Sequence, residues 1–554
     1  MQDKEKVIKS QVSNWRIFKL VSNILRTGVN IEEIAYIFEK SIGQFDRKNK
    51  GQYYTPKEVV DYIVSYLDID ENTKVIDPAC GCGSFLLTVL DKLLSKRENP
   101  NFGNIYGVDL NPTAVNITRL SLLIKGGFKK ELVNLFEKNI KIGNSLTSNK
   151  DLDKLAFQWT TEFAEILKAG GFDCVVGNPP YVTLRVGQDF DPKESLYSSL
   201  IKGPVNAATL MIGRALEILK PGGTLAFVLP KTVLYVESYS RLREFLLKNT
   251  KLIQVFDLGL KFKDVRGEQI ILIAKKEKPQ SEHEVEIRIL KDKSKPLFEQ
   301  PVYKSKQNLF LKLNNKILFF ENKRYYSVLD KITSGKIELS SLVDGLIFRG
   351  LPIGGNSLYI VGENRNGFEQ IIRGKSITKF KIRNVLYINR QILSNVSKTK
   401  LALLRQKKIV LQNIFSMESG IIAALDDQGI LSLDTVTNII INDLQLAKYI
   451  LALLNSKLIN FFVIYGLYNR SRLTMHTDKA YIGRIPITNN PKKELLKKII
   501  KYVDEALKEE ESNKVKEIQR WIDEVVYNIY GLDSNEIKFI EEALQQVISK
   551  KSWW

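Results

Sequence analysis

Asn178-Pro179-Pro180-Tyr181 directly follows a short apolar run that ends at Gly177, and together these four residues offer an unusual set of chemical groups. Consecutive prolines cannot donate backbone hydrogen bonds, so neither a strand nor a helix continues through them. The amide oxygen of Asn178 and a proline carbonyl are therefore rigid acceptors at a strand end, and Tyr181 adds a ring for stacking. Such acceptors suit an exocyclic amine, because binding its hydrogens localises the nitrogen lone pair for attack without a strong base.

A glycine-containing segment upstream, "DPACGCG" from Asp77 to Gly83, has the features of a ligand-binding loop. Gly81 and Gly83 permit close backbone approach, and the helix expected from about Ser84 offers free N–H groups. The segment lacks the third glycine of a dinucleotide fingerprint, and no Gly-Lys-Ser/Thr follows. Asp109 ends the next strand-like run, where a carboxylate suits the two hydroxyls of a ribose. The sequence therefore predicts an adenosine-containing cofactor without a pyrophosphate.

The remaining reactive residues do not suggest a metal. Cys80 and Cys82 are one residue apart, while Cys174, His283 and His476 lie far away in the chain. Such spacing makes a poor zinc site, and no metal is expected.

The elements that must position these groups alternate along the chain. Short apolar runs and helical patterns alternate from about Thr73 to Lys275, which predicts a doubly wound, Rossmann-like α/β sheet. The expected strands are Lys74–Asp77, Ile105–Asp109, Phe172–Val176, Leu225–Leu229, Leu252–Phe256 and Ile270–Ala274. Before them, Thr55 is predicted to cap a helix that has Pro56 at its first position. We expect a helical N-terminal segment (1–50), a catalytic α/β domain (51–285), a mixed α/β domain (286–490) and a helical tail (491–554).

Charge indicates the kind of partner. The 554 residues include 83 Lys and Arg against 62 Asp and Glu, a net charge of +21 that favours a polyanion such as nucleic acid. Eleven of these cations lie between residues 373 and 408, a stretch without an acid. The predicted phosphate contacts are Arg373, Lys375, Lys398, Lys400, Lys407 and Lys408. No apolar run of about 18 residues and no signal peptide is evident, and cysteines are few, so a cytoplasmic protein without a membrane partner is expected.

Four motifs follow one another along the chain in the order "GQYYTP", "DPACGCG", "GVDLN" and "NPPY". In this respect the chain resembles the N6-adenine DNA methyltransferases of restriction–modification systems, in the group whose cofactor motifs come first and whose target recognition domain follows. The resemblance covers nearly the whole chain. It implies methyl transfer from S-adenosylmethionine to the N6 amine of an adenine flipped out of double-stranded DNA.

The resemblance also implies roles for individual residues. The cofactor-binding residues would be Tyr54, Thr55, Pro56, Asp77, Pro78, Ala79, Gly81, Gly83, Asp109, Leu110, Asn144 and Ser145. The family usually has an acid where Asn144 stands, although an asparagine oxygen can also accept a hydrogen bond from the cofactor's adenine amine. The catalytic residues would be Asn178, Pro179, Pro180 and Tyr181, with Phe262 stacking on the outer face of the flipped base.

Several alternatives share part of this pattern. C5-cytosine methylation needs a Pro-Cys nucleophile, which this sequence lacks. Methylation of the cytosine N4 amine uses the same chemistry, and Asn before Pro-Pro favours adenine over it. Glutamine methyltransferases of proteins share the catalytic motif but not the basic region after about residue 290. A modification subunit that works with a separate specificity chain is a further alternative. A monomer is expected, and a cognate restriction endonuclease for the same sequence is left open as a partner.

Overall fold

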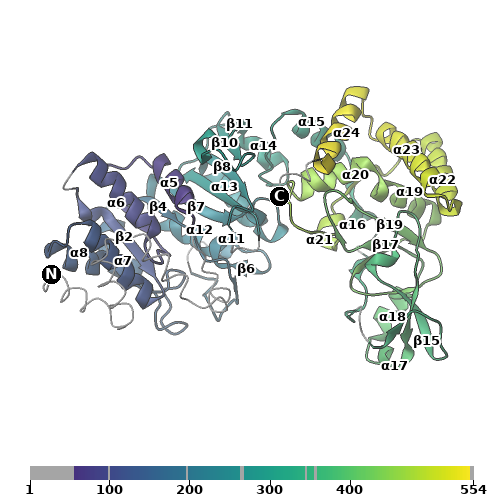
Figure 1. The fold of residues 1–554 in the computed structure, drawn as a ribbon, viewed down its shortest axis with the longest axis horizontal. Coiled ribbons are helices and arrows are strands. Elements are labelled where there is room, and N and C mark those ends of the chain that lie inside the picture. Colours follow the sequence, from purple (N-terminus) through teal and green to yellow (C-terminus); the bar gives the residue numbers. More distant parts are fainter. Residues whose placement is uncertain are drawn as a thin grey trace. The chain divides into compact units, whose positions relative to one another are not determined.

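The computed structural model describes residues 55–97, 100–194, 197–262, 267–343, 346–354 and 358–549. The helical segment expected at 1–50 lies outside these residues. The chain forms two compact units, the first ending at Phe319 and the second beginning at Phe320 (Figure 1).

The first unit is built on a nine-stranded sheet in the order β11-β10-β8-β9-β7-β4-β1-β2-β3. Its strands are β1 (Val75–Asp77), β2 (Ile105–Asp109), β3 (Ile140–Ile142), β4 (Phe172–Gly177), β7 (Leu219–Pro230), β8 (Lys251–Gly259), β9 (Gln269–Lys275), β10 (Glu284–Ile289) and β11 (Val302–Lys306). β1 pairs in parallel with β2 and β4, and β4 with β7, whereas β9 lies antiparallel between β7 and β8. All six runs predicted as strands belong to this sheet, and the α/β prediction is confirmed.

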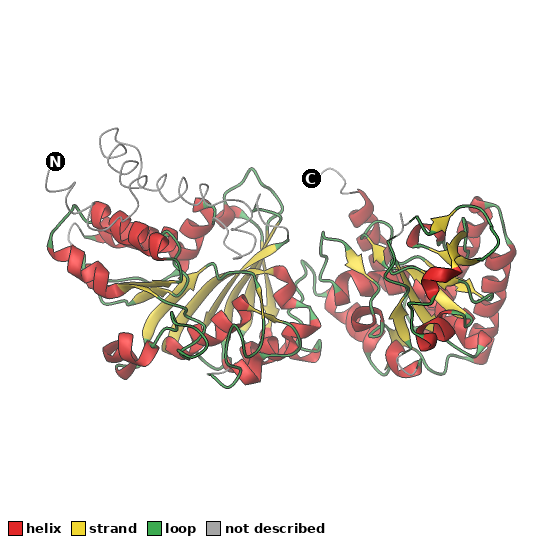
Figure 2. Ribbon diagram, turned by 90° about the horizontal axis from the view of Figure 1, so that it is seen from below, coloured by secondary structure: helices red, strands yellow, loops and turns green. Residues whose placement is uncertain are grey.

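Helices cover both faces of this sheet (Figure 2). The helices of the first unit are α5 (Lys57–Tyr66), α6 (Ser84–Lys96), α7 (Pro112–Lys125), α8 (Glu131–Asn139), α9 (Trp159–Glu162), α10 (Ala164–Lys168), α11 (Tyr197–Leu200), α12 (Ala207–Ile218), α13 (Ser240–Asn249) and α14 (Gln307–Lys312). A small antiparallel pair, β5 (Thr183–Leu184) with β6 (Val205–Asn206), follows the Asn178–Tyr181 motif. α7 starts where the sequence dictates, because Asn111 Oδ1 accepts the N–H of Thr113 at 3.0 Å and Pro112 occupies the first turn.

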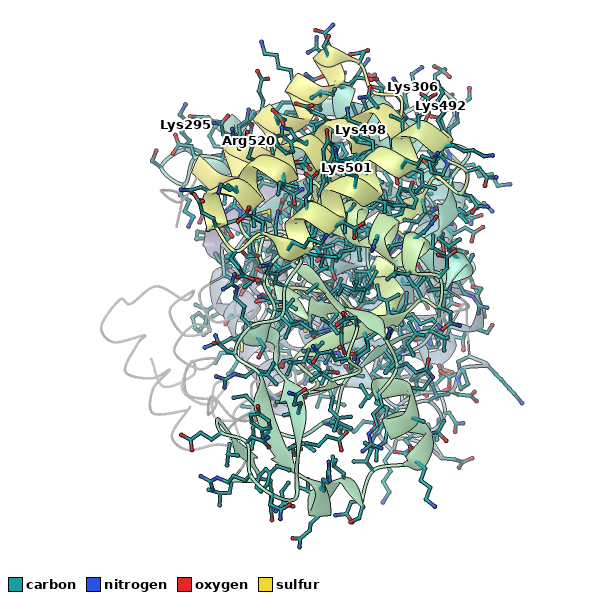
Figure 3. The ribbon with its side chains drawn as sticks, turned by 90° about the vertical axis from the view of Figure 1, so that its right-hand side faces the viewer. Lys295, Lys306, Lys492, Lys498, Lys501 and Arg520 are labelled. Carbon is teal, nitrogen blue, oxygen red and sulfur yellow. The ribbon has the colours of Figure 1, made fainter. Side chains whose placement is uncertain are left out.

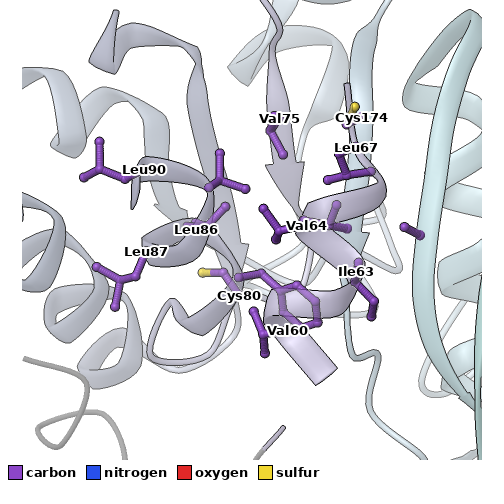
Figure 4. Packing of buried hydrophobic residues seen from close by; sticks show 14 of the residues in the cluster. Val60, Ile63, Val64, Leu67, Val75, Cys80, Leu86, Leu87, Leu90 and Cys174 are labelled. Carbon is purple, nitrogen blue, oxygen red and sulfur yellow. The ribbon is translucent and has the colours of Figure 1, made fainter. Parts of the chain in front are cut away.

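The core under α5 and α6 contains two of the three cysteines. Cys80 and Cys174 pack with Val60, Ile63, Val64, Leu67, Val75, Leu86, Leu87 and Leu90 (Figure 4). Burial raises the pKa of both thiols, so they are weak nucleophiles and serve as small apolar side chains. Among the described residues, no group of three or more His, Cys, Asp or Glu could hold a metal ion.

The second unit contains two small four-stranded sheets. One has the order β13-β21-β17-β19, from β13 (Ile347–Arg349), β17 (Lys408–Gln412), β19 (Ala423–Asp426) and β21 (Val436–Ile440). The other has the order β14-β16-β15-β20, from β14 (Ile360–Val361), β15 (Phe368–Ile372), β16 (Leu386–Asn389) and β20 (Leu431–Ser432). Two-stranded pairs join β12 (Ile337–Glu338) to β23 (Pro486–Ile487), and β18 (Ile414–Phe415) to β22 (Met475–His476).

The helices of this unit are α15 (Arg324–Thr333), α16 (Leu339–Leu342), α17 (Arg390–Leu393), α18 (Lys398–Leu404), α19 (Leu444–Asn455), α20 (Lys457–Phe461), α21 (Lys479–Ile482), α22 (Lys493–Lys508), α23 (Ser512–Ile529) and α24 (Ser534–Ser549). α17, α18 and β15 lie at one end of the unit, and α22, α23 and α24 at the other (Figure 1). The C-terminal helices are packed against the unit, since Tyr530 Oη donates to the carbonyl of Pro486 at 2.6 Å.

Two further features bear on domain organisation. β10 spans residue 285 and β11 follows it, yet both strands pair within the first unit's sheet, so the compact units divide the chain later than the border predicted there. In the described ranges no single helix is long and apolar enough to span a membrane. The segments Leu444–Asn455 and Lys457–Leu467 have that length and composition only when they are taken together, and they are bent relative to each other.

Candidate functional site

The candidate site lies at the carboxyl ends of three neighbouring parallel strands. β1 ends at Asp77, β2 at Asp109 and β4 at Gly177, immediately before Asn178. Because β1 lies between β2 and β4 and pairs in parallel with both, their ends meet at one edge of the sheet. The topology therefore brings the glycine-containing loop, the predicted ribose acid and the Asn178–Tyr181 motif to a common edge, where α/β sheets bind ligands.

Asp77 is a buried carboxyl group at the centre of this edge. Its Oδ1 accepts the N–H of Ala79 at 2.9 Å, and the residue is 2% exposed. Burial raises the pKa of Asp77 to about 8, and the nearby charge of Asp109 adds to the shift, whereas the Ala79 bond opposes it. At neutral pH the group is therefore mostly protonated, and a cationic ligand would favour its charged form.

Asp109 fixes the loop to the second strand. Its Oδ2 accepts the N–H of Gly81 and its Oδ1 that of Asn111, both at 2.8 Å. The carbonyl of Gly81 in turn accepts from Thr118 Oγ1 at 2.8 Å. Asp109 therefore uses both carboxylate oxygens to hold the backbone of Gly81 and that of Asn111, the N-cap of α7.

Gly83 allows the loop to pass close to α7. Its φ is +87°, and a Cβ there would stand 2.8 Å from Thr118 Cγ2. A side chain at this position would therefore push the loop away from the helix, and glycine is required for both reasons.

The segment after β3 adds the residues that the resemblance placed at the cofactor's adenine. Ser145 is buried and its Oγ donates to the carbonyl of Pro78 at 2.6 Å. Asn144 Oδ1 accepts the N–H of Leu146 at 3.0 Å, and its Nδ2 donates to Asp153 Oδ2 at 2.8 Å. The amide of Asn144 is thus used within its own loop, and the carboxylate beside it comes from Asp153.

An apolar rim borders these polar groups. Leu110 is 49% exposed, Ile142 38% and Leu155 44%, although all three are large and apolar. They adjoin one another through the backbone, because Asp109 pairs with Ile142 and the N–H of Asn144 bonds to the carbonyl of Leu155 at 2.6 Å. Ile142, Asp153 and Leu155 could not be predicted from sequence, because the three-residue strand β3 and the loop after it have no periodic pattern that would mark them.

The amide of Asn178 is bonded at both ends. Tyr181 Oη donates to Asn178 Oδ1 at 2.5 Å, and Asn178 Nδ2 donates to Thr55 Oγ1 at 3.0 Å. Asn178, Pro180 and Tyr181 are half-buried, and Pro179 is buried. The structure thus brings Thr55, which the resemblance assigns to the cofactor, together with Asn178 and Tyr181 of the predicted catalytic motif.

Three residues predicted to lie at this edge differ from the prediction or fall outside the described residues. Pro56, not Thr55, is the N-cap of α5, and the Thr55 hydroxyl binds Asn178 instead of capping the helix. Phe262 is 4% exposed and belongs to the core cluster, so in this structure its ring does not offer a face to a base. Tyr54 lies outside the described residues.

The predicted phosphate contacts in the second unit differ in exposure. Lys375, Lys398 and Lys407 are exposed and Arg373 is half-buried. Lys400 is half-buried, with its Nζ on the carbonyl of Arg349 and 4.5 Å from the ring centre of Phe348.

The prediction that Lys408 contacts a phosphate is wrong. The side chain of Lys408 is 0% exposed and forms a buried ion pair with Asp426, so it cannot reach a phosphate. Burial lowers the pKa of Lys408, and the charge of Asp426 opposes that shift.

Acids from outside the stretch 373–408 neutralise several of its other cations. Glu510 pairs with Lys381 and Arg383, and Glu369 pairs with Arg405 at 2.7 Å. The stretch is therefore not one continuous cationic surface, and Lys375, Lys398 and Lys407 are the exposed lysines among its predicted phosphate contacts.

The comparisons with known proteins agree with this architecture. Residues 103–262 match the family described as Eco57I restriction-modification methylase, and residues 369–487 match the TaqI-like C-terminal specificity domain. The chain is similar to the type II methyltransferase M.VspI of Vibrio sp. (strain 343), with 24% identity over 381 residues, or 68% of this chain and 83% of that protein.

Two further similarities were found, one to part of the sequence and one to the fold. The adenine-specific methyltransferase PglX of Streptomyces coelicolor is 32% identical over 152 residues, 21% of this chain and 13% of that protein. The type IIL restriction-modification enzyme MmeI, solved in complex with DNA, has a TM-score of 0.57 at 14% identity, covering 97% of this chain and 79% of that one. The likeness to MmeI concerns the fold alone.

Proposed function

Because the chain is a methyltransferase of the restriction–modification type with a C-terminal recognition domain, we propose that it methylates the N6 amine of adenine in double-stranded DNA, with S-adenosylmethionine as donor. The observation that carries this proposal is the half-buried amide of Asn178 at the end of β4, with its Oδ1 next to Tyr181 and beside the glycine-containing loop.

The residues at the strand ends fit S-adenosylmethionine. When bound, this cofactor supplies a methyl group activated by a sulfonium, and it carries an ammonium group as well. Burial and the charge of Asp109 raise the pKa of Asp77 to about 8. A nearby cation would stabilise the ionised form of Asp77, so this side chain suits a cationic ligand. Asp109 can accept from a ribose, and the rim of Leu110, Ile142 and Leu155 suits the faces of a purine.

The Asn178–Tyr181 motif would act on the target amine. Asn178 Oδ1 and the carbonyl of Pro179 would each accept one hydrogen of the amine, which localises its lone pair toward the methyl group. The nitrogen would take up the methyl group that the cofactor's sulfonium supplies, with the thioether as leaving group, and would then lose a proton to solvent. The Tyr181 ring would stack on the base, which must leave the duplex to reach this edge.

Adenine is preferred over cytosine as the target. Asn before Pro-Pro favours adenine, and one relative, PglX, carries the name adenine-specific. Methylation of the cytosine N4 amine is the second candidate, because its amine has the same hydrogens and the same chemistry. A glutamine amide in a protein is the weakest candidate, because a specificity domain for DNA would then have no use.

The assembly is also part of the proposal. The chain matches only part of three relatives: 22% of the type I restriction enzyme MjaIX methylase subunit, 44% of the type II methyltransferase M.CvrRI and 13% of PglX. The assembly in which this chain works is therefore proposed from its own two units. We propose a monomer that recognises DNA through its own second unit, whereas a modification subunit would need a separate specificity chain.

Two experiments test these points. Long-read sequencing of DNA from a host that expresses the protein should reveal N6-methyladenine within one short sequence, and N4-methylcytosine there would support the second candidate instead. Gel filtration of the purified protein, followed by a methylation assay on that sequence, should find activity in the monomer fraction. Activity that appears only after another chain is added would contradict the monomer.

A further inference from the structure

Thr55 is linked to the catalytic motif across 123 residues of sequence. It is 6% exposed and lies just before α5, and its Oγ1 accepts a hydrogen bond from Asn178 Nδ2 at 3.0 Å. The hydroxyl is not used as a helix cap, because Pro56 is the N-cap of α5. A buried hydroxyl at a helix start therefore bonds to the side chain proposed to activate the amine.

The orientation of that side chain decides whether it can work. The oxygen and nitrogen ends of an asparagine amide have nearly the same shape, and the terminal torsion is broad and roughly two-fold. Only Oδ1 can accept a hydrogen of the target amine. If the amide of Asn178 were rotated by a half-turn, its two N–H donors would face the two N–H donors of the amine, and no activating bond would form.

Two hydroxyl groups bond to the amide of Asn178 in this structure. Tyr181 Oη donates to Oδ1 at 2.5 Å, while Thr55 Oγ1 accepts from Nδ2. The Tyr181 bond involves the oxygen that the target amine needs, and that bond can be exchanged or shared when the base arrives, since the oxygen has two lone pairs. Thr55 holds the opposite end, which the amine does not use, so its bond can persist throughout the reaction.

We propose that Thr55 is a positioning residue that orients the amide of Asn178, so that Oδ1 faces the target amine. This inference rests on the proposed function and deepens it. It assigns the Thr55 hydroxyl to catalysis through Asn178, whereas the sequence resemblance placed Thr55 at the cofactor.

The first test compares Thr55→Val with Thr55→Ser in single-turnover methylation at saturating DNA and S-adenosylmethionine. Valine keeps the shape and removes the acceptor, and serine keeps the acceptor. We expect Thr55→Val to slow the methylation step by roughly 10- to 100-fold, as for loss of one hydrogen bond that matters in the transition state. Thr55→Ser should stay within a few-fold of the parent, and both variants should bind the cofactor and DNA as the parent does.

The matched control is Thr250→Val. Thr250 is 1% exposed and its Oγ1 donates to the carbonyl of Leu246 at 2.7 Å, so the change also removes a buried threonine hydrogen bond. Thr250 precedes β8, which lies antiparallel to β9 as β7 does, so it sits at the amino edge of the sheet, away from the site. Thr250→Val should lower the melting temperature and leave the methylation rate unchanged.

A second test uses a symmetric side chain at position 178. Aspartate presents two equivalent oxygens, so Asn178→Asp needs no orienting partner. The rate loss caused by Thr55→Val should therefore be several-fold smaller in the Asn178→Asp protein than in the parent, which a double-mutant cycle measures.

The outcomes separate this inference from the proposed function. With an active parent, three results would overturn the role of Thr55: weaker cofactor binding by Thr55→Val at an unchanged single-turnover rate, equal losses for valine and serine, or an undiminished loss in the Asn178→Asp protein. A parent that methylates no DNA would overturn the proposed function, and this inference with it.

Discussion

The carboxyl group of Asp77 occupies the space that a side chain at Gly177 would need. A Cβ on Gly177 would stand 2.6 Å from Asp77 Oδ1, and the φ of Gly177 is +150°, which side-chain-bearing residues rarely adopt. The acid of the glycine-containing loop therefore packs directly against the residue that precedes Asn178. This contact joins the proposed cofactor site to the proposed catalytic motif.

Gly177→Ala should impair both sites at once. The added methyl group would displace either the Asp77 carboxyl group or the end of β4, in addition to straining the backbone. We expect weaker S-adenosylmethionine binding by calorimetry together with slower single-turnover methylation. Gly222→Ala is the control, because Gly222 also has a positive φ, +76°, but a Cβ there would meet nothing within 4 Å. Normal cofactor binding by Gly177→Ala would contradict the coupling.

Asp77→Asn should change the pH dependence of stability. An unfolded Asp titrates near a pKa of about 3.9, whereas burial raises the pKa of Asp77 in the folded protein to about 8. Between these values the folded state holds a proton that the unfolded state has lost. The stabilisation is therefore complete below about pH 4 and is lost as pH rises through about 8. Asparagine keeps the bond from Ala79 without that proton, so the melting temperature of the variant minus that of the parent should grow from about pH 5 to about pH 9.

The same group should make cofactor binding depend on pH. A cationic ligand favours the charged form of Asp77, so binding at neutral pH releases a proton. The affinity of the parent for S-adenosylmethionine should increase as pH rises toward about 8, whereas Asp77→Asn should bind more weakly with little pH dependence. Calorimetry in buffers of different ionisation enthalpy measures the released proton. Equal pH profiles for the two proteins would place the cation elsewhere.

Asn178→Ala should remove an acceptor that acts in the transition state. We expect the single-turnover rate to fall on the order of 100-fold or more, while DNA and cofactor affinities stay near those of the parent. Rates within a few-fold of the parent would show that another group activates the amine.

Tyr181 should act through its ring. Tyr181→Phe keeps the stacking surface and loses only the hydroxyl that bonds to Asn178 Oδ1, whereas Tyr181→Ala loses both. Stacking on a base contributes about 1–3 kcal/mol, so the alanine variant should capture the flipped base poorly. With 2-aminopurine at the target position, the fluorescence change on binding should shrink for alanine and persist for phenylalanine. Equal losses would assign the role to the hydroxyl.

The exposed lysines of the stretch 373–408 should bind phosphates without reading sequence. Changing Lys375, Lys398 and Lys407 together to Gln should weaken binding to all duplexes alike, and the slope of log affinity against log salt should fall by about 0.9 for each phosphate that no longer meets a lysine. The methylated sequence should remain the same. Lys408→Gln should instead destabilise the protein by about 3–5 kcal/mol, because it leaves Asp426 buried without its partner.

A charge-matched control distinguishes this surface from general electrostatics. Lys497, Lys498 and Lys501 are exposed on α22, and Figure 3 shows Lys498 and Lys501 on the surface of the C-terminal helices. Changing these three lysines to Gln removes the same charge at the other end of the unit. If the salt slope changed equally in both triple variants, the stretch 373–408 would have no special role in binding phosphates.

Local pattern determined much of the first unit. Strand-forming runs such as Ile105–Asp109 lie between amphipathic helices, and the parallel order then places the last residue of each strand at one edge. The segments from Asp77 to Gly83 and from Asn178 to Tyr181 could be located because glycine and proline restrict their own backbone, whatever surrounds them.

Exposure and partners depended on residues distant in the sequence. Lys407 and Lys408 are adjacent in the sequence and share the same neighbours. The side chain of Lys408 is nevertheless buried against Asp426, while Lys407 is exposed. Phe262 is held in the core of the first unit, and Thr55 bonds to a residue 123 positions later. A run of charges or a lone hydroxyl carries no information about what the fold packs against it, because burial and ion pairing are set by side chains from other segments. Only the tertiary structure decided these positions.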